Sequence, residues 1–220
     1  MSQKVVIFGA GQLAEVICFY LRHDSPFNVV AFTADEKFIT ETKFAGLPLV
    51  PFETIRQTHP TDQYQMFIAL SYRKVNSIRA EKYFEAKNNG YRLISYVNSK
   101  ASCWPGLDIG ENTFIFENNV IQPFVKIGNN TVLWSGNHIG HHSTIGDHCF
   151  LASHIVVSGM VNVGNKTFIG VNSTLRDNIK IGESCVIGAG ALILKDVDDF
   201  SVVPGRGSEV INKKSYEINF

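Results

Sequence analysis

Five of the seven histidines in this 220-residue chain lie in one short stretch. They are His138, His141, His142, His148 and His154. Imidazole titrates near neutral pH, so a positioned histidine can accept a proton from a reacting group, and several together can bind a metal ion. Both roles depend on which of these histidines lie close together in the folded chain. Their positions within a sequence repeat predict this.

A six-residue repeat runs through the second half of the chain. From Ile109 to Ile193, every sixth residue is Ile, Leu or Val. A helix would spread this period around its surface, so the repeat indicates a chain that turns a corner every six residues. His142, His148 and His154 share one phase of the repeat. We therefore expect them to point outward at three different corners, away from any shared metal ion.

A longer period of eighteen residues indicates one full coil with three sides. Ile-Gly or Val-Gly pairs recur at this spacing from 109–110 to 181–182, and the coils should stack about 4.8 Å apart. The fourth residue after each of these aliphatics is small, which predicts an interior ladder of Thr113, Thr131, Cys149, Thr167 and Cys185.

The coil length brings a glycine beside one histidine. Gly159 follows His141 by eighteen residues, so it should lie on the same edge, one coil further on. A glycine there lets a carbonyl group approach its backbone N–H, which would stabilise an oxyanion. A tight corner that needs no side chain would also explain Gly159.

The N-terminal part alternates strands with helices. Strands are predicted at 4–8, 29–32 and 66–70, with helices from 12 to about 21 and from about 74 to 87, which favours a small parallel sheet. The first strand leads into a GxGxxA turn at Gly9 and Gly11, whose N–H groups can face a phosphate or simply form a tight turn. We expect a Rossmann-like α/β domain at 1–98 and a β-helix with a C-terminal tail at 99–220.

A GxG-containing α/β unit joined directly to a hexapeptide prism resembles the sialic acid O-acetyltransferases and bacillosamine-type nucleotide-sugar N-acetyltransferases. The resemblance implies a left-handed β-helix, a homotrimer, and a front domain that holds a nucleotide-linked sugar. It suggests five substrate-binding residues, namely Gly9, Gly11, Gln12, Asp35 and His138. A solvated loop acid is the alternative for Asp35.

The same resemblance assigns catalytic roles. His141 stands where the family has its general base, and Gly159 N–H stands where the family has an oxyanion donor that also contacts the coenzyme. His142 occupies a position that often carries an acid in the family, so we include it among the catalytic residues. Acetyl-CoA is the implied co-substrate. Lys195 and Arg206 are its expected phosphate contacts, with solvated surface charge as the alternative.

Composition restricts the partners. Twenty basic and twenty acidic residues give no net attraction towards nucleic acid or an anionic membrane. No apolar run approaches a membrane span, and four cysteines without CxxC spacing indicate reduced thiols in a cytoplasmic protein.

Three functions therefore remain. The first is N-acylation, with acetyl-CoA, of the amino group of a nucleotide-linked deoxyamino sugar for surface polysaccharide or glycan biosynthesis. The second is O-acetylation of a sugar hydroxyl, as on sialic acid, and the third is a non-catalytic β-helix scaffold. The GxG unit favours the first over the second, and the His141–Gly159 edge disfavours the third.

Overall fold

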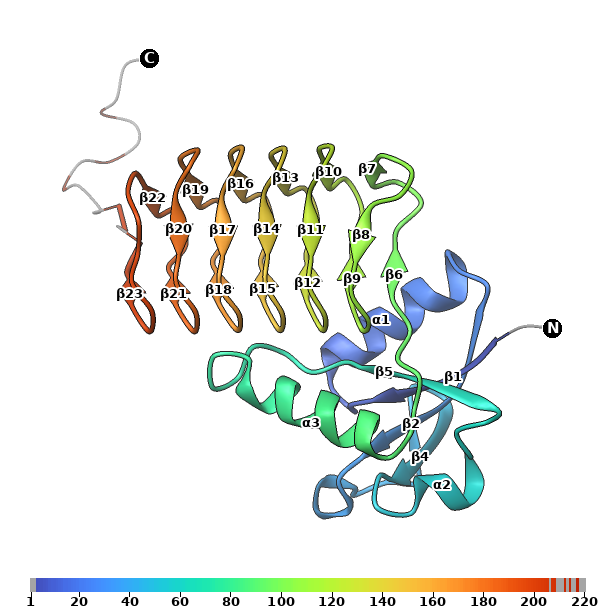
Figure 1. Cartoon of the computed structure of the whole chain (residues 1–220). Helices are drawn as coiled ribbons and strands as arrows, with labels where there is room; N and C mark the ends of the chain where they lie inside the picture. Colours follow the sequence, from blue (N-terminus) through green and yellow to red (C-terminus); the bar gives the residue numbers. More distant parts are fainter. Residues whose placement is uncertain (1–2, 206, 209–211, 213, 215–216, 218–220) are drawn as a thin grey trace.

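The computed structural model describes residues 3–205, 207–208, 212, 214 and 217. Figure 1 shows an α/β unit beside one end of a long triangular prism of coiled strands. Arg206, one of the predicted coenzyme contacts, lies outside the described residues. Among the described residues, no helix combines the length and the apolar character that crossing a membrane requires.

The α/β unit is built on a five-stranded sheet in the order β3-β4-β2-β1-β5. Its elements are β1 (Gln3–Phe8), α1 (Gln12–His23), β2 (Phe27–Ala34), the 3₁₀ turn η1 (Glu36–Phe38), β3 (Lys43–Phe44), β4 (Leu47–Pro51), α2 (Ile55–Thr58), β5 (Tyr64–Ile68) and α3 (Ser77–Asn88). The predicted strands and helices are present, and all strand pairs are parallel except the short β3–β4 pair. The elements β3, β4 and α2 were not predicted from the sequence.

Alternation along β1 explains how the sheet is covered. Val5 and Ile7 pack with α1 and with the prism, whereas Val6 and Phe8 pack on the opposite face with residues of α2 and α3. The sheet is therefore buried on both faces, and one face joins the two units into a single apolar core.

The prism has three sides. Side 1 contains β6 (Tyr96–Val97), β9 (Phe114–Ile115), β12 (Val132–Leu133), β15 (Phe150–Leu151), β18 (Phe168–Ile169), β21 (Val186–Ile187) and β23 (Val202–Val203). Side 2 contains β7 (Ser102–Cys103), β10 (Val120–Ile121), β13 (His138–Ile139), β16 (Val156–Val157), β19 (Thr174–Leu175) and β22 (Leu192–Ile193). Side 3 contains β8 (Asp108–Ile109), β11 (Lys126–Ile127), β14 (Thr144–Ile145), β17 (Asn162–Val163) and β20 (Lys180–Ile181).

The repeat arithmetic is confirmed. Consecutive strands of a side pair in parallel with an offset of eighteen residues, as Ile121 with Ile139 and Ile127 with Ile145. The last pair, β21 with β23, is the exception, because Ile187 pairs with Val203 at an offset of sixteen. Every repeat aliphatic from 115 to 193 is buried, and Ile109 at the first coil is half-buried. The predicted ladder is also present, because the Thr113 and Thr131 hydroxyls donate hydrogen bonds to glycine carbonyls at 2.8 and 2.9 Å.

The corners have a common backbone conformation. The third residue after each repeat aliphatic from Ile109 to Ile187 takes a left-handed φ, including 53° at Asn130, 59° at His142 and 61° at His148. Asparagine tolerates this conformation better than most residues, and this explains its frequency at the corners. We name the corners by the sides that they join: the 1–2 edge holds Trp134, the 2–3 edge holds His141, and the 3–1 edge holds His148.

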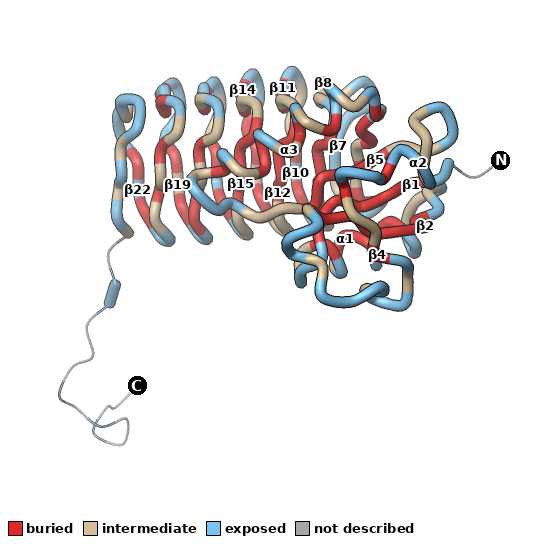
Figure 2. Tube along the Cα trace, turned by 90° about the horizontal axis from the view of Figure 1, so that it is seen from below, coloured by how far each residue is buried: buried red, intermediate tan, exposed pale blue. Residues whose placement is uncertain are grey.

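The α/β unit is fixed to side 1 and to the 3–1 edge. Seen from below in Figure 2, α3 crosses the prism near β12 and β15. Arg79 of α3 is fully buried and donates from Nη2 to the carbonyls of His148 and Cys149, at 2.7 and 2.9 Å. Burial lowers the pKa of Arg79 to about 10, so the guanidinium stays charged at neutral pH.

Candidate active site

The exposed His141 lies directly over Gly159. A methyl group added to Gly159 would come within 2.8 Å of both Cε1 and Nε2 of the imidazole, so only glycine fits beneath the ring in this position. The eighteen-residue spacing predicts that these two residues share one edge, and the structure brings them into contact there. Within the described residues, the Gly159 N–H donates no hydrogen bond.

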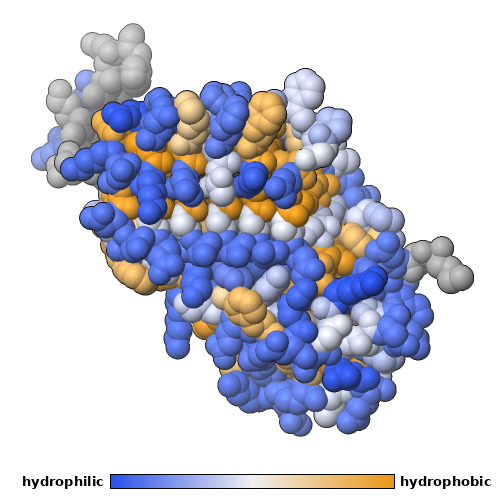
Figure 3. Space-filling view, viewed as in Figure 1, coloured by the Kyte–Doolittle hydropathy of each residue, from blue (hydrophilic) through white to orange (hydrophobic). Residues whose placement is uncertain are grey.

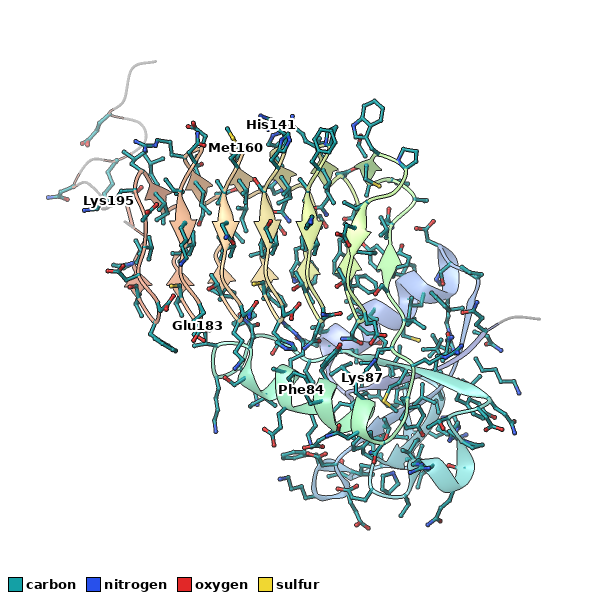
Figure 4. The ribbon with its side chains drawn as sticks, in the orientation of Figure 1. Phe84, Lys87, His141, Met160, Glu183 and Lys195 are labelled. Carbon is teal, nitrogen blue, oxygen red and sulfur yellow. The ribbon has the colours of Figure 1, made fainter. Side chains whose placement is uncertain are left out.

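Neighbouring coils hold the His141 turn from both sides. The His141 N–H donates to Oε1 of Gln122 on the preceding coil at 2.9 Å, and the Met160 N–H donates to the His141 carbonyl at 2.8 Å. Figure 4 shows His141 and Met160 side by side on this edge, on the far side of the prism from the Phe84 and Lys87 side chains of α3. The imidazole is thus positioned by backbone contacts while its ring stays open to solvent.

His142 contacts the ring of His141. The two Nδ1 atoms lie 3.1 Å apart, and the His142 ring also packs against Phe124 of the preceding coil, with ring centroids 4.6 Å apart. Among the described residues, no carboxylate lies within 4 Å of either imidazole. Among the described residues, the side-chain partner of the His141 imidazole is therefore a second imidazole.

His148 differs from the expectation of an outward, exposed side chain. Tyr83 and Phe84 of α3 cover it, and its Nδ1 lies 2.8 Å from Nδ2 of Asn130. Burial lowers the pKa of His148 to about 4. His154 is exposed on the 1–2 edge. Within the described part of the chain, no three His, Cys, Asp or Glu side chains group closely enough to hold a metal ion.

A pocket of about 920 Å³ opens at the carboxyl ends of β1, β2 and β5, the usual ligand site of a parallel α/β sheet. Gly9, Gly11, Gln12 and Asp35 all line it, so the structure brings these four predicted residues together. Gly9 has a φ of +129°, and a side chain there would approach the Ala69 carbonyl to 2.8 Å. Gly11 precedes α1 with open space around it.

Charged groups in this pocket are unevenly compensated. Asp35 forms an ion pair of 2.7 Å with Lys82, which also contacts Glu85 at 2.8 Å. Arg73, in the loop after β5, lines the pocket as well and forms no ion pair within the described residues. For a negatively charged ligand in this pocket, the Arg73 guanidinium is therefore available, whereas the Lys82 ammonium is already neutralised by Asp35 and Glu85.

Some predicted residues lie apart from both clusters. His138 is on the outward face of β13, between the 1–2 and 2–3 edges, and it does not line the pocket. Lys195 is exposed at the far end of the prism in Figure 4, three eighteen-residue coils or about 14 Å beyond His141. The pocket and the His141–Gly159 pair belong to different edges, so a single chain does not bring them together.

Several pocket residues were not predicted from the sequence. Trp134 reaches the pocket from the prism, and Arg73 and Lys82 reach it from the loop after β5 and from α3. The rule that ligands bind beyond the carboxyl ends of parallel strands pointed to the loop that holds Arg73. Nothing in the repeat pattern indicated Trp134, because its role depends on where the α/β unit docks.

Comparisons with known proteins agree with this architecture. The sequence model of the family described as bacterial transferase hexapeptide (six repeats) matches residues 108–140, 124–159 and 160–195. A search of curated protein sequences found no significant match.

Several solved structures superpose over almost the whole chain. A mutant of perosamine N-acetyltransferase from Caulobacter crescentus, in complex with CoA and GDP-perosamine, has a TM-score of 0.84 at 23% identity, covering 93% of this chain and 95% of that chain. The acetyltransferase domain of PglB from Neisseria gonorrhoeae gives 0.82 at 20% identity, covering 92% and 97%. WeeI from Acinetobacter baumannii gives 0.78 at 18%, again covering 92% and 97%. The chain thus carries the hexapeptide repeat over residues 108–195 and shares the fold of these three structures, α/β unit and left-handed β-helix alike.

Proposed function

We propose that the chain is an acetyl-CoA-dependent N-acetyltransferase acting on the amino group of a nucleotide-linked deoxyamino sugar. The observation that carries this proposal is the His141 imidazole lying over Gly159, whose N–H is unused within the described residues. Acetyl transfer to an amine needs one group to accept a proton and another to stabilise the oxyanion. On the 2–3 edge, the His141 imidazole can accept the proton, and the adjacent Gly159 N–H can stabilise the oxyanion.

The tautomer of His141 determines whether it can act as a base. If Nδ1 of His141 carries the hydrogen and donates it to Nδ1 of His142, the Nε2 lone pair is free on the side that faces Gly159. His142 would then orient the base and share the charge that develops on it. This is the role that a carboxylate plays in many acid–base pairs.

The reaction balances with these groups. The substrate amine attacks the thioester carbonyl and forms the new C–N bond, while His141 Nε2 takes the amine proton. The tetrahedral oxyanion accepts a hydrogen bond from the Gly159 N–H. Collapse breaks the C–S bond, and the imidazolium gives its proton to the departing coenzyme A thiolate, which leaves as the thiol.

The pocket at the GxG turn supports a nucleotide-linked acceptor. The uncapped amino end of α1 and the Arg73 guanidinium face the same space, which suits a diphosphate. Asp35 lies at the end of β2, where an acid can bind ribose hydroxyls. The fold match to an enzyme structure that contains CoA and GDP-perosamine supports the same substrate class.

The separation of the two edges supports a shared site between copies. Side 2 exposes Val120, Val156 and Leu192, whereas side 3 presents Lys126, Thr144, Asn162 and Lys180 outward. Figure 3 also shows apolar side chains exposed along the upper edge of the prism. We infer a homotrimer in which the sugar held by one chain meets His141 of a neighbour, with His138 on the face between. Light scattering that finds a monomer at micromolar concentration would overturn it.

Coenzyme A is placed along the prism in this proposal. Its thioester lies at Gly159, and its phosphates lie towards Lys195 at the far end. Arg206, the second expected phosphate contact, lies outside the described residues. Because acetyl-CoA and nucleotide-linked sugars are both cytoplasmic metabolites, we place the enzyme in the cytoplasm. The balanced net charge supports neither a nucleic acid partner nor an anionic membrane surface as partner.

The direct test measures coenzyme A release from acetyl-CoA with a panel of UDP-, dTDP- and GDP-linked amino sugars. We expect release with at least one of them, and mass spectrometry should locate the acetyl group on the sugar nitrogen. Free sialic acid serves as the contrasting acceptor. Acetylation of its hydroxyl, with every amino sugar inert, would replace N-acetylation by the O-acetyltransferase function.

A further inference from the structure

Trp134 is the point where the nucleotide pocket meets the prism. Of the residues that line the 920 Å³ pocket, it alone comes from the prism, and it also lines a second hollow of about 420 Å³ along the 1–2 edge. Its indole stacks on Phe116 with centroids 4.3 Å apart and planes at 7°. One face of the indole is therefore covered by Phe116, and the other face lines the two pockets.

The turn that carries Trp134 is held firmly. Asn119 and Asn137 both donate from Nδ2 to the Trp134 carbonyl, and both asparagines are buried. The indole thus forms a preorganised wall, and a ligand can bind it without first ordering the side chain.

The position of the phosphates determines what meets this wall. In the proposed function the diphosphate lies at the turn of Gly9 and Gly11, with the nucleoside towards Asp35. The sugar hangs from the terminal phosphate, so it must extend the other way, out of the α/β unit towards the prism where acetyl transfer occurs. That path passes Trp134.

The hollow beyond Trp134 is largely apolar. Its walls include Leu13, Phe150, Ala152, Phe168 and Val171. A sugar hydroxyl turned towards such a surface loses its water without gaining a partner, whereas a methyl or methylene group there gains from burial.

We propose that the indole of Trp134 is the platform on which the sugar ring stacks, and that it selects a sugar with a deoxygenated, methyl-bearing face. This inference rests on the proposed function and specifies the substrate class of the same site. Trp134 acts here as a specificity-determining residue, since neither proton transfer nor the oxyanion depends on it.

Fluorescence gives the first test, because the chain has two tryptophans and Trp104 is exposed. In Trp104→Phe, emission reports on Trp134 alone. We expect a GDP- or UDP-linked 6-deoxyamino sugar to change this emission more than GDP or UDP does, since only the sugar reaches the indole. Equal changes with both ligands would overturn the proposal.

Substrate discrimination gives the second test. With two nucleotide amino sugars that differ only in CH₃ or CH₂OH at C6, the wild type should prefer the methyl form by about 10- to 100-fold in kcat/KM. Trp134→Gln should reduce the preference to a few-fold and leave the affinity for the nucleoside diphosphate unchanged, while Trp134→Phe should keep most of it. An undiminished preference in Trp134→Gln contradicts the proposal. If the wild type acetylates neither sugar, the proposed function fails, and the fluorescence test still decides on Trp134.

Discussion

Two corners of the prism carry histidines in the same repeat phase and have opposite properties. His142 and His148 are six residues apart and share a left-handed φ of 59° and 61°. On the 2–3 edge, His142 is exposed and contacts His141; on the 3–1 edge, His148 is buried under α3 and has a pKa of about 4. The repeat makes the two backbone positions equivalent. The exposure and the pKa of each imidazole depend instead on whether another part of the chain, such as α3, packs against the corner.

The largest expected effect is on the 2–3 edge. His141→Ala should lower kcat by about 10²- to 10⁴-fold, because it removes the proposed proton acceptor. Its thermal unfolding should stay close to that of the wild type, since the side chain is exposed. Steady-state kinetics with acetyl-CoA measures the effect, and His154→Ala, exposed on another edge, is the matched control. A near wild-type kcat in His141→Ala with every acceptor would show that another group is the base.

Gly159→Ala should displace the same imidazole without removing it. The new methyl group would lie 2.8 Å from Nε2, which is too close, so the ring must move. Misplacing a catalytic group by about 1 Å lowers the rate by roughly 10²-fold. If displacement is the cause, the double variant with His141→Ala should be no slower than His141→Ala alone. A further loss in the double variant would instead assign the effect to the Gly159 amide.

On the 3–1 edge the expected effect is on stability. The pKa of His148 is about 4 in the folded chain and about 6.5 when unfolded, so the unfolded state binds more protons between these values. The free energy of unfolding should therefore fall by about 3 kcal/mol as the pH drops from about 6.5 to about 4. Denaturant unfolding at several pH values tests this. His148→Asn should show a flatter dependence in that range, and an unchanged slope would assign the loss to other groups.

The smallest effect is expected for His142. His142→Ala removes one hydrogen-bond partner of His141, worth roughly 1 kcal/mol or up to about tenfold in kcat. His142→Asn, which tolerates the left-handed φ, is the matched control for the backbone. Equal losses in both variants assign the effect to the imidazole, whereas a loss in His142→Ala alone assigns it to the corner conformation.

The sequence predicted the prism well because the same short strand and corner recur in every repeat. Ile121, Ile139 and Val157 occupy identical positions by periodicity, so burial and pairing follow from counting. The His141–Gly159 contact follows from the same count. The short strands β3 and β4 were missed because strands of two and five residues carry too little pattern to be recognised.

What the sequence could not predict depends on how the α/β unit docks. Trp134 lines the nucleotide pocket only because that unit lies beside the 1–2 edge, and His148 is buried only because α3 crosses the 3–1 edge. The repeat pattern predicts neither contact, because each joins a corner of the prism to residues of the α/β unit that are distant in sequence.

The docking contacts have a consequence for the order of events during synthesis. Ile68 binds Asn112, Arg79 binds His148, and Asn76 binds Lys166, so partners are 44, 69 and 90 residues apart. The α/β unit leaves the ribosome first, yet its interface is completed only after four further coils have been made and stacked. Until then the apolar face of its sheet and the Arg79 guanidinium lack their partners, which makes the half-made chain the stage most exposed to aggregation.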